Sequence, residues 1–161
     1  MILDVEQIEI LKQSINSTLE NIYKNDYDLI ERGGMEQSLS FRYGLYFNDI
    51  IKNLDWLKNH NIDLEYNKNG LNPKKTPRRP NGVRPDLILH KRRENNNNIL
   101  VVEFKGWWNG DRESDLIKLE DFVNQDGEYK YGLGVFIEFN IEKPTIEYFT
   151  GYWINSKKTS P

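Results

Sequence analysis

Two apolar segments separated by a short polar turn are the feature of this sequence that most restricts its fold. The first segment, 85–91, reads PDLILHK, and the second, 99–105, reads ILVVEFK. Between them lies RRENNNN, whose four consecutive asparagines suit a turn and disfavour a strand. Short runs rich in Val and Ile and bounded by polar residues are typical of β-strands. The pattern therefore predicts an antiparallel β-hairpin at the centre of the chain.

Helical periodicity precedes this hairpin. Apolar residues recur at steps of three and four through the first segment, which we expect to form an N-terminal helix within 1–32. A second helix is predicted from about residue 35 to 58. Its expected buried stripe is Leu39, Tyr43, Tyr46, Ile50, Leu54 and Leu57. Glu36 lies three residues before Leu39, so its carboxylate is expected at the interior edge of that helix.

A third helix and two strands are predicted after the hairpin. The helix is expected over about 114–125, capped by Asp111 or Ser114. The segments 132–140 and 145–154 have the composition of strands. Helices covering a mixed sheet are the simplest architecture for this order of elements. The sequence thus predicts an α/β fold, a mixed β-sheet with a central β-hairpin flanked by helices.

Length and composition fit one globular domain. The chain has 161 residues, and its 4 Trp, 9 Tyr and 7 Phe require a packed core. We expect a single domain over 1–161, with a core at 36–140 and an extra strand at 145–154. No segment has the length or hydropathy of a membrane span, and the acidic N-terminus does not resemble a signal peptide. We therefore expect a cytoplasmic protein without a membrane partner.

Several kinds of chemistry are excluded by residue counts. The chain has no cysteine, so disulfides, thiolate metal sites and cysteine nucleophiles are excluded. It has only two histidines, His60 and His90, which argues against a zinc site built from histidine. The net charge of −3 is near neutral and names no partner.

Two carboxylates and an ammonium group are expected at the open end of the hairpin. A turn centred between residues 95 and 96 would place Asp86 opposite Lys105. Glu103 and Lys105 share one face of their strand because they are two residues apart. Asp86 and Glu103, with the backbone carbonyl of Phe104, would suit Mg²⁺ or Mn²⁺. Such a metal polarises a phosphate and lowers the pKa of a bound water, and Lys105 would orient that water or stabilise the developing charge.

These residues resemble a known motif. Pro85-Asp86 followed by Glu103-Phe104-Lys105 is similar to the signature of the PD-(D/E)XK nucleases, the restriction-endonuclease-like superfamily. The resemblance covers roughly residues 36–140 by element order. It implies that Asp86 and Glu103 bind a divalent metal, that Lys105 is the catalytic lysine, and that Glu36 is the upstream helical glutamate. It also implies metal-dependent hydrolysis of phosphodiester bonds, with DNA as the expected substrate.

A basic segment adjoins the motif. Residues 72–93 contain eight basic residues and one acid, in a protein of negative net charge. Such local asymmetry is typical of surfaces that bind a phosphate backbone. The residues expected to contact nucleic acid are Lys74, Lys75, Arg78, Arg79 and Arg84.

Each feature also has a plainer interpretation. Asp86 could simply begin a strand, and Glu103 and Lys105 could form the solvated face of an edge strand. Glu36 could be a first-turn acid that favours the helix dipole. The basic segment could be a solvated loop. Trp107 and Trp108 could stack on bases or pack in a core or an interface.

Two other functions remain open from the sequence. The chain could be a non-catalytic member of the same fold that binds nucleic acid or a protein, or an α/β domain unrelated to nucleic acid. Cleavage of both strands of a duplex by one site per chain would call for a homodimer, a partner subunit or two successive nicks. No segment of the sequence identifies an interface.

Overall fold

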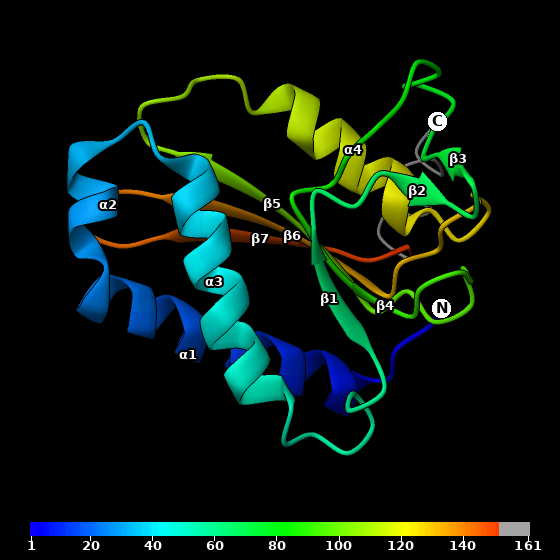
Figure 1. Ribbon diagram of the computed structural model, residues 1–161, viewed down its shortest axis with the longest axis horizontal. Coiled ribbons are helices and arrows are strands. Elements are labelled where there is room, and N and C mark those ends of the chain that lie inside the picture. Colours follow the sequence, from blue (N-terminus) through cyan, green and yellow to red (C-terminus); the bar gives the residue numbers. More distant parts are fainter. Residues whose placement is uncertain (152–161) are drawn as a thin grey trace, which may run out of the picture.

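A computed structural model describes residues 1–151 as an α/β protein (Figure 1). Its main sheet has five strands in the order β1-β4-β5-β6-β7, and a small second sheet pairs β2 with β3. Only β5 and β6 are parallel, so the main sheet is mixed, as predicted. The elements are α1 (Val5–Asn25), α2 (Tyr27–Arg32), α3 (Glu36–Ile51), β1 (Asn61–Leu64), β2 (Lys68–Asn69), β3 (Asn72–Pro73), β4 (Leu87–His90), β5 (Leu100–Gly106), α4 (Glu113–Val123), β6 (Leu133–Phe139) and β7 (Thr145–Phe149).

The N-terminal helical segment is interrupted at Asp26. The expected helix within 1–32 is divided into α1, which begins with a capping box at Asp4, and the short α2. The buried Asp26 carboxylate accepts hydrogen bonds from Arg42 Nε and Tyr46 Oη, each at 2.7 Å. Both donors belong to α3, so the Asp26 carboxylate links the junction of α1 and α2 to α3.

The helix α3 is shorter than predicted and is rotated relative to its expected buried face. It ends at Ile51, and the chain continues to residue 58 in turns. The buried side chains of α3 are Leu39, Tyr43, Phe47 and Ile51. They recur every four residues, so Phe47 and Ile51 replace the predicted Tyr46 and Ile50 in the core.

The central hairpin is confirmed, but its register differs from the prediction by two residues. Leu87 pairs with Val102 and Leu89 with Leu100, so the hairpin is centred on the Glu94–Asn95 peptide. A two-residue shift leaves every side chain on its predicted face, because side chains alternate with a period of two.

The third predicted helix and both later strands are present. The N-cap of α4 is Arg112, without a side-chain cap hydrogen bond, so the expected caps Asp111 and Ser114 are wrong. This helix connects the parallel strands β5 and β6. β7 ends at Phe149 rather than at 154, and residues 152–154 of that prediction lie outside the described residues.

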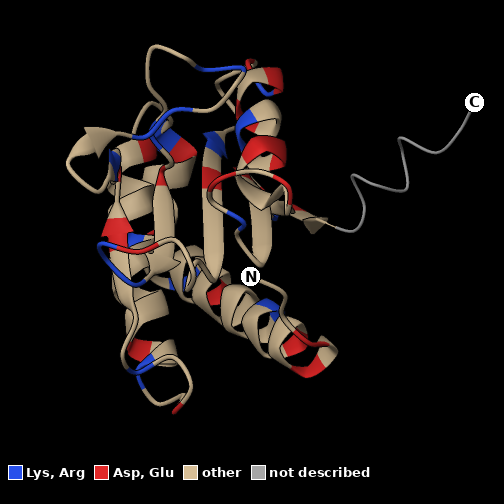
Figure 2. Cartoon of the chain, turned by 90° about the vertical axis from the view of Figure 1, so that its right-hand side faces the viewer, with Lys and Arg blue, Asp and Glu red and all other residues tan. Residues whose placement is uncertain are grey.

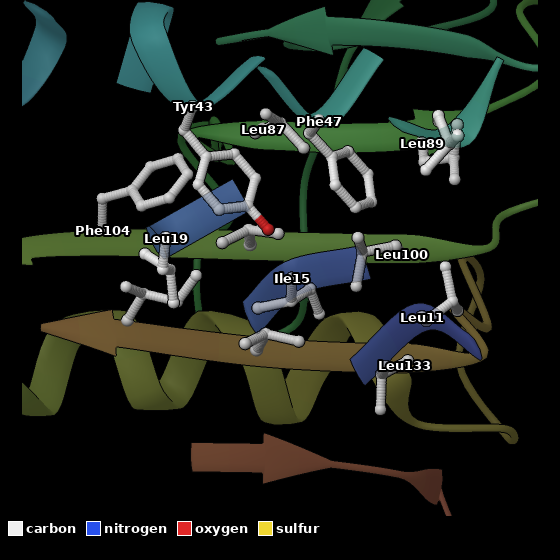
Figure 3. Close-up of a cluster of buried hydrophobic side chains, with 14 of the residues drawn as sticks. Leu11, Ile15, Leu19, Tyr43, Phe47, Leu87, Leu89, Leu100, Phe104 and Leu133 are labelled. Atoms are coloured by element: carbon white, nitrogen blue, oxygen red, sulfur yellow. The ribbon is translucent and has the colours of Figure 1, made fainter. Parts of the chain in front are cut away.

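Helices cover both faces of the sheet (Figure 1). Helices α1, α2 and α3 pack on one face, where Ile15, Tyr43 and Leu100 belong to the larger hydrophobic cluster (Figure 3). Helix α4 packs on the other face, where Val101, Leu119 and Phe136 form part of a second cluster. No helix among the described residues is long and apolar enough to cross a membrane.

Candidate active site

The open end of the β4–β5 hairpin brings the two predicted metal-binding carboxylates together. The register continues by one residue from the Leu87–Val102 pair, which puts Asp86 opposite Glu103 rather than opposite Lys105. Directly opposed residues share one face of a sheet. This is the face that α4 covers, because Val101 packs against α4 and lies two residues before Glu103.

Glu103 is a fully buried carboxylate in the central strand. Its side chain is 0% exposed, and its Oε2 accepts a hydrogen bond from Lys118 Nζ at 2.5 Å. Its Oε1 has no hydrogen-bond partner among the described residues. Burial raises the pKa of Glu103 well above its usual range, and the nearby negative charge of Asp86 raises it further. The alternative in which Glu103 and Lys105 form the solvated face of an edge strand is therefore wrong.

A chain of ion pairs links β5 to α4. Lys105 Nζ lies 2.6 Å from Asp115 Oδ2, and Lys118 Nζ lies 2.9 Å from Asp115 Oδ1. Lys118 thus bridges Asp115 and Glu103. Burial lowers the pKa of Lys118, but the charges and hydrogen bonds of these two acids outweigh it, so its pKa is raised. Both lysines are held by carboxylates on the α4 side of the sheet.

Asp86 connects this buried cluster to solvent. It lines a cleft of about 440 Å³, together with Glu36, Gln37, Ser40, Leu64 and Glu65. Its Oδ2 accepts a hydrogen bond from the Phe104 N–H at 2.8 Å. Burial raises the pKa of Asp86, although the Phe104 hydrogen bond and the Lys118 charge oppose the shift. Glu103 does not line the cleft, so Asp86 is the accessible member of the pair.

Phe104 contributes to the site through its backbone. Its side chain points to the opposite face of the sheet, with its ring 4.9 Å from that of Tyr43. The N–H and the carbonyl of one strand residue point toward the same neighbouring strand. Because the Phe104 N–H reaches Asp86, its carbonyl faces the same side, where the sequence predicted a third oxygen ligand.

Glu36 lines the cleft and also anchors the end of β5. Its Oε1 accepts hydrogen bonds from the Gly106 N–H at 2.9 Å and from Asn109 Nδ2 at 3.3 Å. The charge of Glu36 contributes to the raised pKa of Asp86. The predicted helical glutamate is therefore brought to the same cleft as Asp86, and it has a structural contact there as well.

Two of the five residues predicted to contact nucleic acid are buried or paired with other side chains. Lys74 is 2% exposed, and Arg78 forms ion pairs with Glu120 and Asp121 of α4. Figure 2 shows basic and acidic segments interspersed. The charge asymmetry of the sequence is thus partly cancelled by acids that are distant along the chain.

The other three residues predicted to contact nucleic acid form no ion pair with α4 within residues 1–151. Arg79 Nη2 donates a hydrogen bond to Ser114 Oγ at 2.9 Å, beside the N-terminus of α4. Arg84 is exposed and lies 3.6 Å from Glu65, which lines the Asp86 cleft. Lys75 is exposed and makes no ion pair within residues 1–151. Within residues 1–151, none of the three forms an ion pair or a hydrogen bond with Asp86 or Glu103.

Asp115 is the site residue that sequence reasoning missed, and Lys118 is one for which the sequence favoured a surface position over a reach toward the site. Asp115 lies four residues before the buried Leu119, so it occupies the apolar stripe of its helix. The same signal drew attention to Glu36 in the second helix. Lys118 follows the hairpin on the next helix and could reach the site from there, and the structure shows that reach rather than the surface position that the sequence favoured.

Comparisons with protein-family models, with curated proteins and with solved structures found no match for this chain. The candidate site therefore stands on its own geometry: two apposed carboxylates, one of them fully buried, beside two lysines held by a third acid.

Proposed function

We propose that this protein is a metal-dependent nuclease that hydrolyses phosphodiester bonds, with DNA as its expected substrate. The observation that carries the proposal is Glu103, a fully buried carboxylate directly opposite Asp86, one of whose oxygens has no partner within residues 1–151. A buried carboxylate without a full set of partners is costly unless a cation or donors satisfy it. The proposal includes a restriction-endonuclease-like core, which the helix, hairpin, helix and parallel-strand order supports.

The donor set fits a hard divalent cation. Asp86, Glu103 and the Phe104 carbonyl supply only oxygen atoms, which Mg²⁺ and Mn²⁺ prefer, and water would complete the coordination. No group of three or more His, Asp or Glu side chains among residues 1–151 is placed to hold a metal. A site of two carboxylates agrees with the sparing use of protein ligands by Mg²⁺. When bound, the metal would supply Lewis acidity and a more acidic water.

Lys105 would stabilise negative charge on the attacked phosphate or orient the attacking water. Asp115 lies 2.6 Å from its ammonium group and restricts the position of that group. Lys118 neutralises Glu103 when no metal is present. Glu36 shapes the cleft next to Asp86 and holds the backbone of Gly106. Arg79, Arg84 and Lys75 would contact the phosphates on either side of the cleavage point.

Calorimetry with Mg²⁺ and with Mn²⁺ tests the metal site on which this function depends. Saturable binding that is lost in Asp86→Ala is expected, whereas no binding of either cation would overturn the proposal. A substrate panel of supercoiled plasmid, single-stranded DNA, branched DNA and RNA then identifies the substrate class. The matched control is Asp49→Ala, which removes an exposed carboxylate remote from the hairpin.

A second candidate function is a non-catalytic nucleic-acid-binding or protein-interaction module on the same fold. The ion pair between Lys118 and Glu103 favours it, because a lysine already satisfies one of the two Glu103 oxygens. A mobility shift with nucleic acid that is insensitive to metal and to Asp86→Ala would support this function over the nuclease.

A further inference from the structure

A second hollow lies at the opposite end of β4 from Asp86. It has a volume of about 260 Å³ and is formed by the β2–β3 hairpin and the turn after β4. The residues that line it include Tyr66, Lys68, Lys74, His90, Arg93 and Glu94. His90 is four residues from Asp86 along an extended segment, which corresponds to about 13 Å. The hollow is therefore separate from the carboxylate cluster.

The floor of this hollow contains a buried ammonium group. Lys74 is 2% exposed, and its Nζ donates a hydrogen bond to the Lys68 carbonyl at 2.5 Å. The Nζ also lies 4.9 Å and 5.4 Å from the ring centroids of Tyr66 and Tyr129. No carboxylate oxygen within residues 1–151 forms an ion pair with it. A buried cation without a counter-ion is costly, and cation–π contacts offset this only in part.

The acidic groups around the hollow are occupied by other donors. Glu94 accepts a hydrogen bond from Asn97 Nδ2 at 2.9 Å, and Glu128 accepts one from Asn69. Asp63 is bound by Arg92 Nε at 2.9 Å and by His90 Nε2 at 2.8 Å. Within residues 1–151, none of these acids forms an ion pair with Lys74, although the charges of Glu128 and Asp63 act on it from a distance.

Further positive charge lies at the rim. Lys68 is exposed, and Arg93 is exposed with a φ of 72°, in the left-handed region that non-glycine residues seldom adopt. Backbone in such a sparsely populated region costs on the order of 1–3 kcal/mol and tends to occur at ligand sites. The turn thus holds an arginine in an unfavourable conformation beside the buried lysine.

We propose that this hollow binds a phosphate group, with Lys74 at its floor and Lys68 and Arg93 at its rim. A phosphate oxygen would accept hydrogen bonds from the two Lys74 N–H groups that the Lys68 carbonyl does not use. The phosphate is either free inorganic phosphate or the terminal phosphate of a nucleic acid. The second source rests on the proposed nuclease function, and the first does not.

Calorimetric titration with inorganic phosphate, in EDTA at pH 7, tests the proposal. Lys74→Met keeps the apolar stem and removes the charge, and it should weaken binding about 10-fold or more. Arg93→Gln changes only an exposed side chain, so it tests the proposal even if Lys74→Met does not fold. It should weaken phosphate binding several-fold. Lys58→Met, an exposed lysine elsewhere, should bind as the parent does. Absent phosphate binding, or binding unchanged in both Lys74→Met and Arg93→Gln, would overturn the proposal.

Proton uptake gives a second readout. Burial lowers the pKa of Lys74 to about 8, although Glu128 and Asp63 oppose this shift. The other charged or titratable groups facing it are Lys68, Arg93, Glu94, His90, Tyr66 and Tyr129. An anion beside Lys74 would raise that pKa, so binding at pH 8.5 should take up protons. Heats measured in two buffers of different ionisation enthalpy should show this uptake, and it should disappear in Lys74→Met.

Oligonucleotides identify the source of the phosphate. The Asp86→Ala variant in EDTA is titrated with one oligonucleotide carrying a 5′-phosphate and with the same oligonucleotide carrying a 5′-hydroxyl. A preference of about 10-fold or more for the phosphorylated form assigns the hollow to nucleic-acid ends. Equal oligonucleotide affinities beside saturable inorganic phosphate binding assign it to the free anion. Cleavage plays no part in this measurement, so failure of the nuclease proposal would leave it interpretable.

Discussion

Removal of the Lys118 ammonium group should lower the folding stability of the protein, because it takes the cationic partner away from the buried Glu103 carboxylate. In Lys118→Met the carboxylate, 0% exposed, loses the donor at 2.5 Å from its Oε2. Breaking a buried ion pair from one side typically costs about 3–5 kcal/mol of folding stability. We expect a loss in that range at pH 8, measured by urea unfolding. Asp115 retains Lys105, so the unpaired charge of Glu103 dominates the loss.

The loss should depend on pH in a defined direction. Folding already raises the pKa of Glu103, and removal of Lys118 raises it further. A carboxyl group with a raised folded-state pKa stabilises the protein below its unfolded-state pKa, and that contribution is lost as the pH rises toward the folded-state value. The destabilisation by Lys118→Met should therefore grow as the pH rises from the folded-state pKa of Glu103 in the parent toward the higher value in the variant, by at most about 1.4 kcal/mol per pH unit.

Two controls sharpen this result. Lys52→Met removes a lysine that is 55% exposed in a surface pair, so it should change stability by less than about 1 kcal/mol. In a Glu103→Gln background, Lys118→Met should lower the free energy of unfolding by less than half as much as it does in the parent. A Lys118→Met protein as stable as the parent at pH 8, or equally destabilised at every pH, would show that Lys118 does not offset the buried charge of Glu103.

Three further changes have expected outcomes. Asp26→Ala removes the acceptor of Arg42 and Tyr46 and should lower the free energy of unfolding by about 2–3 kcal/mol in urea. Gly106→Ala would place a Cβ 2.3 Å from the Trp108 ring, so a loss of about 1–3 kcal/mol is expected by thermal denaturation. Mg²⁺ at about 100 times its dissociation constant should stabilise the parent by about 2.7 kcal/mol, measured as a rise in Tm, and should not stabilise Asp86→Ala.

Matched variants identify results that would contradict these expectations. Asp28→Ala, at an exposed carboxylate, should leave stability nearly unchanged. A loss of stability equal to that of Asp26→Ala would contradict the stabilising role of the Asp26 hydrogen bonds. Gly110→Ala adds a Cβ with no atom within 4 Å and should be tolerated, unlike Gly106→Ala. A Mg²⁺ effect that persists in Asp86→Ala would place the cation elsewhere.

The local pattern of the sequence predicts the hairpin and the face of each of its side chains. Those faces depend only on the alternation of strand residues, so they survive the two-residue difference in register. The register itself depends on where the chain turns within seven polar residues, which composition does not determine. Asp86 and Glu103 could therefore be placed together, whereas the direct opposition of Asp86 to Glu103 could not.

Features that depend on contacts distant along the chain could not be predicted. The break at Asp26 depends on donors that α3 supplies sixteen and twenty residues later. The neutralisation of Arg78 depends on acids of α4 more than forty residues away. Lys118 looks like a surface lysine in the sequence, and only the packing of α4 on β5 brings it to Glu103. Interactions of this kind are set by tertiary packing.

Nicking of supercoiled plasmid by the purified protein, with Mn²⁺ or with EDTA, shows whether the protein is a metal-dependent nuclease. We expect metal-dependent nicking that is lost in both Asp86→Ala and Lys105→Ala and retained in the exposed control Asp49→Ala. Nicking that survives in Asp86→Ala, or that proceeds equally in EDTA, would rule out a catalytic metal site built on Asp86 and Glu103.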